Sequence, residues 1–329
     1  MENLTVNFFE KIPDQILTCL PNELYRLLQG PALFFLPGKK SGPPLFISTL
    51  IHGNEPSGFL ALQRLWQEEG FILDRPLLLF LGNIRAAQIN ERYLADGPDF
   101  NRIWGEGPCA SLPLVSDVIT KIQKYKPIFA VDLHNTSGLN PPYSALSVLR
   151  PLELSLAQAF SLIAVHYSEP NTTLSHKLTS FCPSIAVECG KNTDPLSHQK
   201  AYQFIKICLK IDQLSLLPNS SLQIYESLMR IYIPPGSSLS FNPAHSANFN
   251  FISDLDKFNF KDVPVGTIIG KCEKKFLLLD DNKKDHFDYY FKLIKNEIMV
   301  IKNFIPSLLT INPESALQDC LGYIMTQKF

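Results

Sequence analysis

Short runs of apolar residues recur along the first two thirds of the chain. Several of these runs are continuous rather than alternating, which is typical of strands buried on both faces of a mainly parallel sheet. β-Branched residues and phenylalanine are frequent in them, which also favours strands. We predict strands at residues 33–35, 45–51, 77–81, 128–133, 145–149 and 184–187.

The stretches between these runs have apolar residues at helical spacing. Residues 57–69, for example, place Phe59, Leu62, Leu65 and Trp66 on one side of a helix. We predict further helices at residues 112–124, 152–163 and 197–216. Alternation of strands and helices predicts an α/β domain with a mixed, mainly parallel sheet flanked by helices.

The pattern changes near Pro218, where "PNSSL" is typical of a loop or linker. The chain beyond it is richer in strand and turn signals, including Pro-Gly and Asp-Asn pairs. We therefore predict a first domain at residues 1–217 and a smaller, β-rich domain at 218–329, with one helix at about 289–301.

Composition narrows the class of protein. The 329 residues are 45% hydrophobic and 19% charged, which is enough to bury a substantial core. The formal net charge of −1 gives no basic field for nucleic acid or an anionic membrane, so neither is an expected partner. Seven scattered cysteines without a C-x-x-C motif indicate reduced thiols. With no secretory signal pattern and no apolar run of bilayer length, we expect a cytoplasmic protein.

Polar residues gather where four of the predicted strands end, which is where α/β enzymes place their chemistry. They lie in "HGNE" (52–55), "DFNRIW" (99–104), "VDLHNTSG" (131–138) and "AVECGKN" (186–192), with Arg92 just upstream of the second.

Three of these residues fit a catalytic zinc site. Zinc prefers imidazole and carboxylate ligands, and a catalytic site uses three of them and leaves one position open. His52 and Glu55 lie three residues apart at a strand-to-helix turn, and His134 ends another strand. The alternative is a hydrogen-bonded histidine at the sheet edge and an acid near a helix N-terminus, because short motifs of this kind often occur without a metal.

The remaining polar residues each have two interpretations. Glu188 suits a general base in an apolar pocket, or an edge acid paired with Lys191. Arg92, Asn101 and Arg102 suit recognition of a carboxylate or an oxyanion, or ordinary turns at the surface. Asp132 lies two residues before His134, so both point to the same side of a strand. It either orients that histidine or is simply a buried, hydrogen-bonded acid.

Taken in order, "HGNEPSG", "RYLADGPDFNRIW", "VDLHNTSG" and "AVECG" resemble the motifs of the succinylglutamate desuccinylase/aspartoacylase family, a branch of the zinc carboxypeptidase superfamily. The resemblance covers about residues 33–206 well and the C-terminal domain in outline. It implies a zinc-carboxypeptidase-like domain followed by a smaller β domain that helps to close the active site.

The resemblance also assigns roles to residues. It implies one Zn²⁺ per chain, with His52, Glu55 and His134 as its ligands. Glu188 falls on the catalytic base that activates water, and Arg92 on the arginine that polarises the scissile carbonyl. Asn101 and Arg102 fall on the pair that grips a substrate carboxylate. The implied reaction is hydrolysis of the amide bond of a small N-acyl amino acid.

The chain departs from this family pattern in two places. The stretch between Arg92 and Asn101 is about two residues longer than in aspartoacylase-like sequences. Aspartoacylases have a second substrate arginine shortly before the catalytic glutamate, and here Lys177 alone lies near that place, with Arg150 the other fixed cation of the region. Lysine does not replace a bidentate arginine, so N-acetylaspartate is not assigned as the substrate. The resemblance also implies a C-terminal substrate tyrosine, for which Tyr289 and Tyr290 are the candidates.

Other functions remain open on the sequence alone. A peptidase or amidase of the same superfamily would share every residue named above, and a metal-binding module without catalysis would share the three ligands. A cysteine nucleophile at Cys189 or Cys109 is a weaker alternative, because neither has an evident histidine partner. The sequence does not specify the oligomeric state, and a homo-oligomer is compatible with it.

Overall fold

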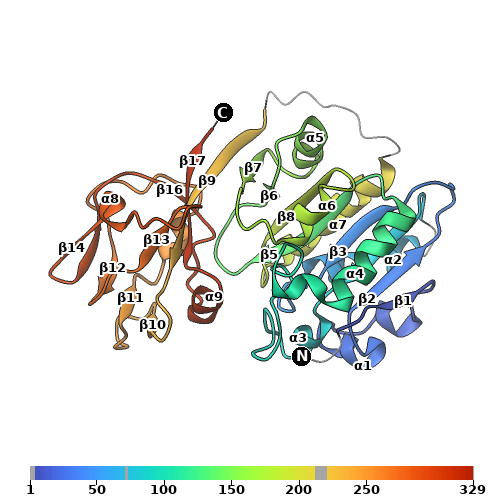
Figure 1. The fold of residues 1–329 in the computed structure, drawn as a ribbon, viewed down its shortest axis with the longest axis horizontal. Coiled ribbons are helices and arrows are strands. Elements are labelled where there is room, and N and C mark those ends of the chain that lie inside the picture. The colour runs from blue at the N-terminus through green and yellow to red at the C-terminus, as the bar shows by residue number, and fades with distance from the viewer. Residues whose placement is uncertain (1–3, 71–72, 212–220, 329) are drawn as a thin grey trace. The chain divides into compact units, whose positions relative to one another are not determined.

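A computed structural model describes residues 4–70, 73–211 and 221–328 (Figure 1). The chain forms two units. The first comprises Met1–Asn135 and Pro142–Leu222, and the second Thr136–Pro141 and Gln223–Phe329. The predicted boundary after residue 217 lies outside the described residues. The short segment Thr136–Pro141, which belongs to the second unit, was not foreseen from the sequence.

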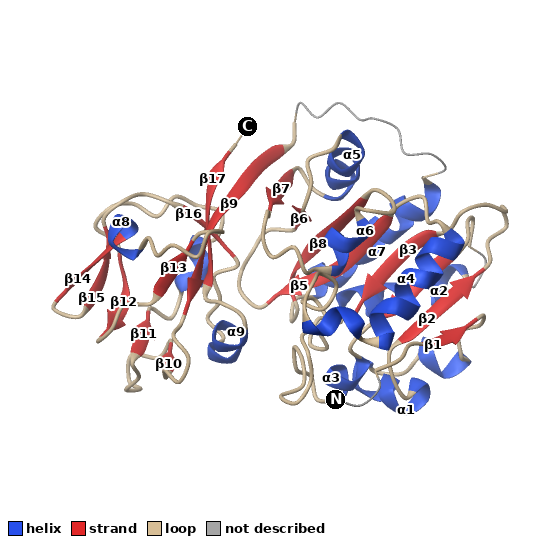
Figure 2. Ribbon diagram, in the orientation of Figure 1, coloured by secondary structure: helices blue, strands red, loops and turns tan. Residues whose placement is uncertain are grey.

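The first unit is built on a mixed sheet with helices on both sides (Figure 2). Its strand order is β1-β2-β4-β3-β5-β8-β6-β7. The pairs β1–β2, β3–β4, β3–β5 and β6–β7 are parallel, whereas β2–β4 and β6–β8 are antiparallel. The predicted mixed, mainly parallel sheet is therefore confirmed. The strands are β1 (Asn7–Phe9), β2 (Ala32–Leu36), β3 (Leu45–Thr49), β4 (Leu77–Leu81), β5 (Ala130–Thr136), β6 (Tyr143–Leu146), β7 (Ile163–His166) and β8 (Ser184–Lys191).

Burial of the central strands explains their continuous apolar sequences. Every residue of β3 and β4 is buried, because helices cover both faces. On one face, α4 and α6 join a cluster that includes Phe46, Leu78 and Phe80, while α2 and α7 pack against each other. The helices of this unit are α1 (Leu24–Leu28), α2 (Ser57–Glu69), α3 (Ile84–Gln88), α4 (Pro113–Tyr125), α5 (Pro151–Phe160), α6 (Leu174–Leu178) and α7 (Pro195–Lys210).

The four helix predictions of the first unit are confirmed in position, and three of them differ at their ends. Helix α2 has the predicted bounds, and α4, α5 and α7 each begin at a proline, whose fixed φ suits the first turn. The predicted helix 152–163 ran too far, because Ile163 already begins β7. The last part of the predicted helix 197–216 lies outside the described residues.

The second unit is rich in β structure, as predicted. Strand β9 (Gln223–Tyr232) pairs antiparallel with β13 (Leu277–Leu279) and β17 (Gly322–Gln327), and β17 pairs with β16 (Ile305–Ser307). A separate sheet has the order β10-β11-β12-β15-β14. Its strands are β10 (Leu239–Ser240), β11 (Phe249–Phe251), β12 (Ile268–Cys272), β14 (Phe291–Ile294) and β15 (Glu297–Val300). A helix, α9 (Pro313–Gln318), lies between β16 and β17 in the sequence.

The predicted helix at 289–301 is wrong. Only a single turn forms, α8 (Phe287–Tyr290), and the chain continues as an antiparallel hairpin of β14 and β15. Lys295 and Asn296 between them have φ values of 49° and 67°, as a tight hairpin turn requires. The hairpin buries Phe291, Ile298 and Val300 in the core of the unit, and this tertiary packing outweighs the helical spacing.

None of the described helices combines the length and the apolar character needed to cross a membrane.

Candidate active site

His52 and Glu55 lie on the turn that joins β3 to α2. The amide of Glu55 donates to the carbonyl of His52 (3.2 Å), which closes the turn. The amide of Gly53 donates to the carbonyl of Arg92 (3.1 Å), and a Cβ at Gly53 would overlap the backbone of Ala86 and Ala87. Glycine is therefore required where the turn packs onto α3, and this packing fixes both functional side chains.

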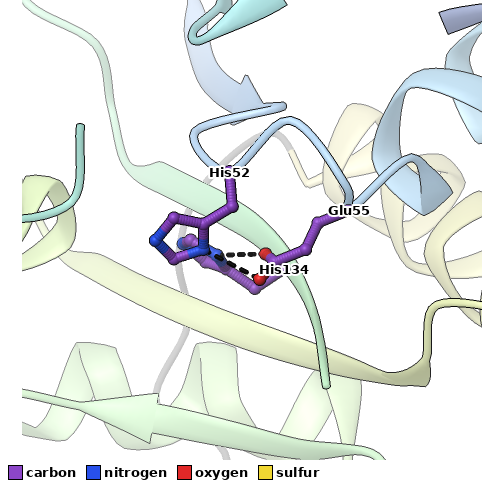
Figure 3. A group of neighbouring side chains, drawn as sticks. All are labelled: His52, Glu55 and His134. Carbon is purple, nitrogen blue, oxygen red and sulfur yellow. Dashed lines mark hydrogen bonds and ion pairs between the residues drawn. The ribbon is translucent and has the colours of Figure 1, made fainter. Parts of the chain in front are cut away.

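The carboxylate of Glu55 joins two imidazole rings, as Figure 3 shows. Its Oε1 lies 2.8 Å from Nδ1 of His52, and its Oε2 lies 2.7 Å from Nδ1 of His134 on β5. All three side chains are buried, and one ligand atom from each lies within 4.8 Å of the others. The three residues can hold a metal ion, and they are the three that the sequence placed together.

The outer nitrogen of each ring contacts a further carboxylate. Nε2 of His52 lies 3.2 Å from Oδ1 of Asp99, and Nε2 of His134 lies 2.8 Å from Oδ2 of Asp132. Asp132 is itself fixed by a hydrogen bond from the hydroxyl of Ser48 to Oδ1 (2.7 Å). Each ring is thereby held with Nδ1 directed at Glu55.

The charges of this group depend on one another. Burial favours a higher pKa for Glu55, but the positive charges of His52 and His134 outweigh it and hold the pKa of Glu55 below its usual range. Burial lowers the pKa of His134, but Asp132 and Glu55 outweigh it, so its pKa lies well above the usual value. Each imidazole lies between two carboxylates, which only accept hydrogen bonds. A neutral imidazole has one N–H, so its second nitrogen must either carry a proton as well or bind a cation. The donor set therefore fits a metal ion chemically.

Glu188 lies on β8, within electrostatic reach of the same group of charges. Burial, reinforced by Glu55 and Asp132, raises its pKa to about 8, although His134 and Arg92 act in the opposite direction. Its Oε2 is buried and has no hydrogen-bond partner among the described residues. The alternative pairing with Lys191 is not seen in the described part of the chain, since residues three apart on a strand point to opposite faces.

Asp99 links the second motif to His52. Both Nε and Nη2 of Arg92 contact its Oδ2 (3.2 and 3.1 Å), and the amide of Asn101 donates to its Oδ1 (2.7 Å). Burial favours a higher pKa for Asp99, but Arg92 and His52 outweigh it and hold that pKa well below the usual value. Asp99 therefore contacts both Arg92 and His52, and the role of Arg92 at a scissile carbonyl stays a prediction.

Asn101 and Arg102 make local contacts. The side-chain oxygen of Asn101 accepts a hydrogen bond from the amide of Leu174, the first residue of α6 (3.1 Å). Nη1 of Arg102 donates to the carbonyl of Asn101 (2.9 Å). The two residues are adjacent and half-buried, and their role in gripping a carboxylate stays a prediction.

Lys177 and Tyr289 lie in different units. Lys177 is half-buried on α6, and its side chain makes no ion pair with the described residues. Tyr289 is exposed on α8 in the second unit, where its hydroxyl contacts Nζ of Lys302. Its neighbour Tyr290 is buried in the core of that unit. Roles for these residues in substrate binding stay predictions.

Sequence reasoning missed two residues that organise the site. Asp99 is the first residue of the "DFNRIW" motif. An aspartate at the start of a turn often accepts a hydrogen bond from the amide two residues later, as Asp99 does from Asn101, and this pattern could have identified it. Asn135 makes three hydrogen bonds. Its backbone amide donates to Oε2 of Glu55 (3.2 Å), and its side-chain Nδ2 donates to the carbonyl of Gly190 (3.0 Å). Its Oδ1 accepts from the backbone amide of Ser57 (3.1 Å). No local sequence signal predicts these long-range contacts.

Solved structures of low sequence identity share this fold. A succinylglutamate desuccinylase/aspartoacylase from Rhodobacter sphaeroides matches with a TM-score of 0.59 and 17% identity, over 89% of this chain and 88% of that one. The product-bound ectoine utilization protein EutE (DoeB) from Ruegeria pomeroyi matches with a TM-score of 0.59 and 14% identity, over 89% and 88%. Murine aminoacylase 3 matches with a TM-score of 0.54 and 14% identity, over 88% and 97%.

No match was found among curated protein sequences. The model of the succinylglutamate desuccinylase/aspartoacylase catalytic domain matches residues 41–214, which include every polar motif of the site and more than half of the chain. The chain therefore belongs to the succinylglutamate desuccinylase/aspartoacylase family.

Proposed function

We propose that the protein is a zinc-dependent deacylase that hydrolyses the amide bond of a small N-acyl amino acid. The observation that carries this proposal is the buried group of His52, Glu55 and His134, with Glu188 beside it, in a chain of this family. Family membership gives the deacylase class, and the geometry supports the metal and the base.

Zinc is the metal that the donor set favours. Two imidazole nitrogens and one carboxylate are the ligands of many catalytic zinc sites, whereas calcium and magnesium prefer oxygen ligands alone. The contacts of Asp99 and Asp132 with the outer nitrogens orient both rings, as is usual for histidine ligands. Bound there, zinc would supply Lewis acidity and lower the pKa of water towards neutrality.

Glu188 is proposed as the general base. Its oxygen without a partner and its pKa of about 8 suit a group that must accept a proton and later release it. It would take a proton from the attacking water molecule and deliver that proton to the leaving amine. Both transfers involve the same carboxylate, so the group returns to its starting state after each turnover.

The arginines and Asn101 are proposed to bind substrate. Asp99 fixes the guanidinium of Arg92 within electrostatic reach of Glu188, where a positive charge would stabilise the oxygen of the scissile carbonyl. Asn101 and Arg102 would hold the carboxylate of the amino acid, through the amide of one and the guanidinium of the other.

Metal analysis and a substrate screen test the proposal together. Purified protein should contain about one zinc per chain and should release free amine from at least one N-acetyl, N-succinyl or N-formyl amino acid. The Glu188→Gln variant in the same screen separates catalysis by this site from a contaminating hydrolase. Zinc binding without hydrolysis of any N-acyl amino acid would contradict the deacylase activity, and cleavage of peptides instead would identify a peptidase of the same chemistry.

A further inference from the structure

The turn that carries His52 and Glu55 and the strand that carries Glu188 are not neighbours in the sheet of the first unit. Strand β5 lies between β3 and β8 (Figure 2), so the β3–α2 turn meets β8 across the end of β5. Sheet pairing fixes β8 against β5, whereas the turn lies beyond the last residue of β3, Thr49. The placement of Glu188 relative to the turn therefore depends also on side chains that bridge the two.

Asn135, which follows His134 on β5, makes both halves of such a bridge. Its Oδ1 accepts a hydrogen bond from the amide of Ser57 (3.1 Å), and its Nδ2 donates to the carbonyl of Gly190 (3.0 Å), two residues beyond Glu188. Asn135 is 5% exposed, so both bonds form away from water, where the loss of a partner is most costly. One side chain therefore joins the start of α2 to the end of β8.

Helix α2 takes this contact because its own sequence provides no cap. Its N-cap residue is Pro56, whose side chain has no acceptor for the free amides of the first turn. Oδ1 of Asn135 supplies that acceptor from another element. Glu55 directly precedes Pro56, and the backbone amide of Asn135 donates to its Oε2 (3.2 Å). The start of α2 and the carboxylate of Glu55 are thus held by the same residue.

The end of β8 carries this contact and a second one. Gly190 has a φ of 109°, which residues with a side chain rarely adopt, and a Cβ there would lie 2.8 Å from the hydroxyl oxygen of Ser197. Two residues later, Nδ2 of Asn192 donates to the carbonyl of Asn54 in the β3–α2 turn (3.0 Å). Asn192 therefore ties the end of β8 to the same turn by a route that does not pass through β5.

We propose that Asn135 and Asn192 are positioning residues for Glu188: together they set its carboxylate against the turn that carries two of the proposed metal ligands. This inference rests on the proposed function, since it takes Glu188 as the base. Proton transfer between a base and an attacking water depends steeply on their separation, whereas binding of the metal requires its ligands alone. Loss of the bridges should therefore lower turnover more than zinc binding.

Turnover of the zinc-loaded, full-length enzyme tests the proposal, with an N-acyl amino acid that the substrate screen identifies. Asn135→Ala removes both halves of the first bridge. It should lower kcat about 10- to 100-fold, with KM and zinc content close to those of the unmodified protein. Asn192→Ala removes one hydrogen bond at a half-buried position and should lower kcat about two- to tenfold.

Amide hydrogen exchange of the metal-free protein is a second readout. In Asn135→Ala, the peptides that contain Ser57 and Gly190 should both exchange faster, because each has lost its partner. Unchanged exchange at both peptides would show that the bridge does not hold these segments and would overturn the inference.

A double-mutant cycle shows whether the effect passes through the base. In Glu188→Gln the carboxylate that Asn135 positions is gone, so adding Asn135→Ala should lower the residual turnover by no more than about twofold. An equal loss with and without Glu188 would mean that Asn135 acts on the metal ligands or on the fold, and would overturn the inference.

Asn7→Ala is the matched control. Asn7 also donates from its side-chain Nδ2 to a backbone carbonyl of the first unit, that of Leu28 (2.9 Å), but it lies on β1 at the edge of the sheet. This variant should lose stability and keep the kcat of the unmodified protein.

The outcomes separate this inference from the proposed function. If no N-acyl amino acid is hydrolysed, or if Glu188→Gln keeps full turnover, the proposed function fails and this inference fails with it. If Glu188→Gln loses turnover while Asn135→Ala and Asn192→Ala keep it, however far their unfolding temperatures fall, both asparagines are only structural and the inference alone is overturned. Should Asn135→Ala not fold, Asn192→Ala decides: unchanged kcat overturns the inference, and a loss of kcat that is absent in the Glu188→Gln background supports it.

Discussion

Asp99 holds His52 and Arg92 with the two oxygens of one carboxylate. Its Oδ1 lies 3.2 Å from Nε2 of His52, and its Oδ2 accepts both contacts from Arg92. A residue of the proposed metal site and a residue proposed to bind the scissile carbonyl therefore share one anchor. Any shift of that anchor must move both.

Asp99→Asn tests this shared anchor. Asparagine keeps an oxygen for the amide of Asn101 but removes the charge that holds Arg92, and it offers an NH₂ group in place of one acceptor. We expect zinc affinity to fall about 10- to 100-fold, with a loss of kcat/KM that exceeds the loss of zinc occupancy. Titration with zinc and kinetics at saturating zinc measure the two effects. Asp96→Asn, at an exposed position of the same loop, should change neither; a normal Asp99→Asn enzyme would show that the anchor is dispensable.

Glu188→Gln separates metal binding from proton transfer. The amide is nearly isosteric with the carboxyl group but cannot accept the proton of the attacking water. Zinc content should stay at the level of the unmodified protein, while kcat should fall by about 10²–10⁴-fold. Retention of full turnover would remove Glu188 from its proposed role. The complementary change His134→Ala should lose zinc first and activity as a consequence.

The raised pKa of Glu188 predicts how the stability of the metal-free protein depends on pH. Burial raises the pKa of Glu188 from its ordinary value of about 4.5 to about 8, so the folded state holds a proton that the unfolded chain has already lost. The contribution of Glu188 to stability is full below about pH 4.5 and is lost as pH rises towards 8. In this range the unfolded chain has lost the Glu188 proton while the folded protein must still bind it, so each rise in pH favours the unfolded chain. Relative to Glu188→Gln, the free energy of unfolding should decline across this range and level off above it. Urea unfolding of both metal-free proteins at several pH values measures the difference; parallel curves would mean that Glu188 is not buried as a neutral acid.

Much of the first unit was predictable because its elements are strongly patterned. Strands β3 and β4 are buried on both faces, and their sequences are therefore continuously apolar. Helix α2 is buried on one side only, and its apolar residues therefore recur at helical spacing. His52, Glu55 and His134 were predictable as a group because ligand type, spacing and strand ends point to the same chemistry. Local sequence and tertiary structure agree at each of these positions.

The elements that were missed depend on contacts distant in sequence. The hairpin at Phe291–Val300 has apolar residues that also fit a helix, and only the core of the second unit and the turn at Lys295-Asn296 decide between the two. Asn135 and Asn259 are polar residues whose partners lie 50 or more residues away along the chain. Local periodicity carries no information about such partners.

Gly58→Ala tests the packing behind the proposed metal site. A Cβ at Gly58, in the first turn of α2, would overlap the Thr49 side chain and the Cβ of Leu133. Alanine favours helices, yet here α2 would have to move away from β3 and β5, and we expect a net loss of about 1–3 kcal/mol of stability. Urea unfolding measures this loss, with Gly30→Ala as control, where a Cβ would meet only Asn7 at an ordinary 3.7 Å. An unchanged or higher stability of Gly58→Ala would mean that α2 adjusts without cost.

Lys177 is expected to decide whether the enzyme accepts an amino acid with a second carboxylate. Arg150, the other fixed cation of this region, is committed to Glu153 and to the carbonyl of Thr179, whereas the described structure gives Lys177 no ion pair. Lys177→Gln should raise KM for an N-acyl aspartate or glutamate by about tenfold, the worth of one charge-assisted hydrogen bond, and leave KM for a neutral N-acyl amino acid unchanged. Steady-state kinetics with paired substrates of equal acyl group measure the ratio, and Lys210→Gln, exposed at the end of α7, controls for net charge. An equal rise for both substrates would show that Lys177 supports the fold rather than the choice of substrate.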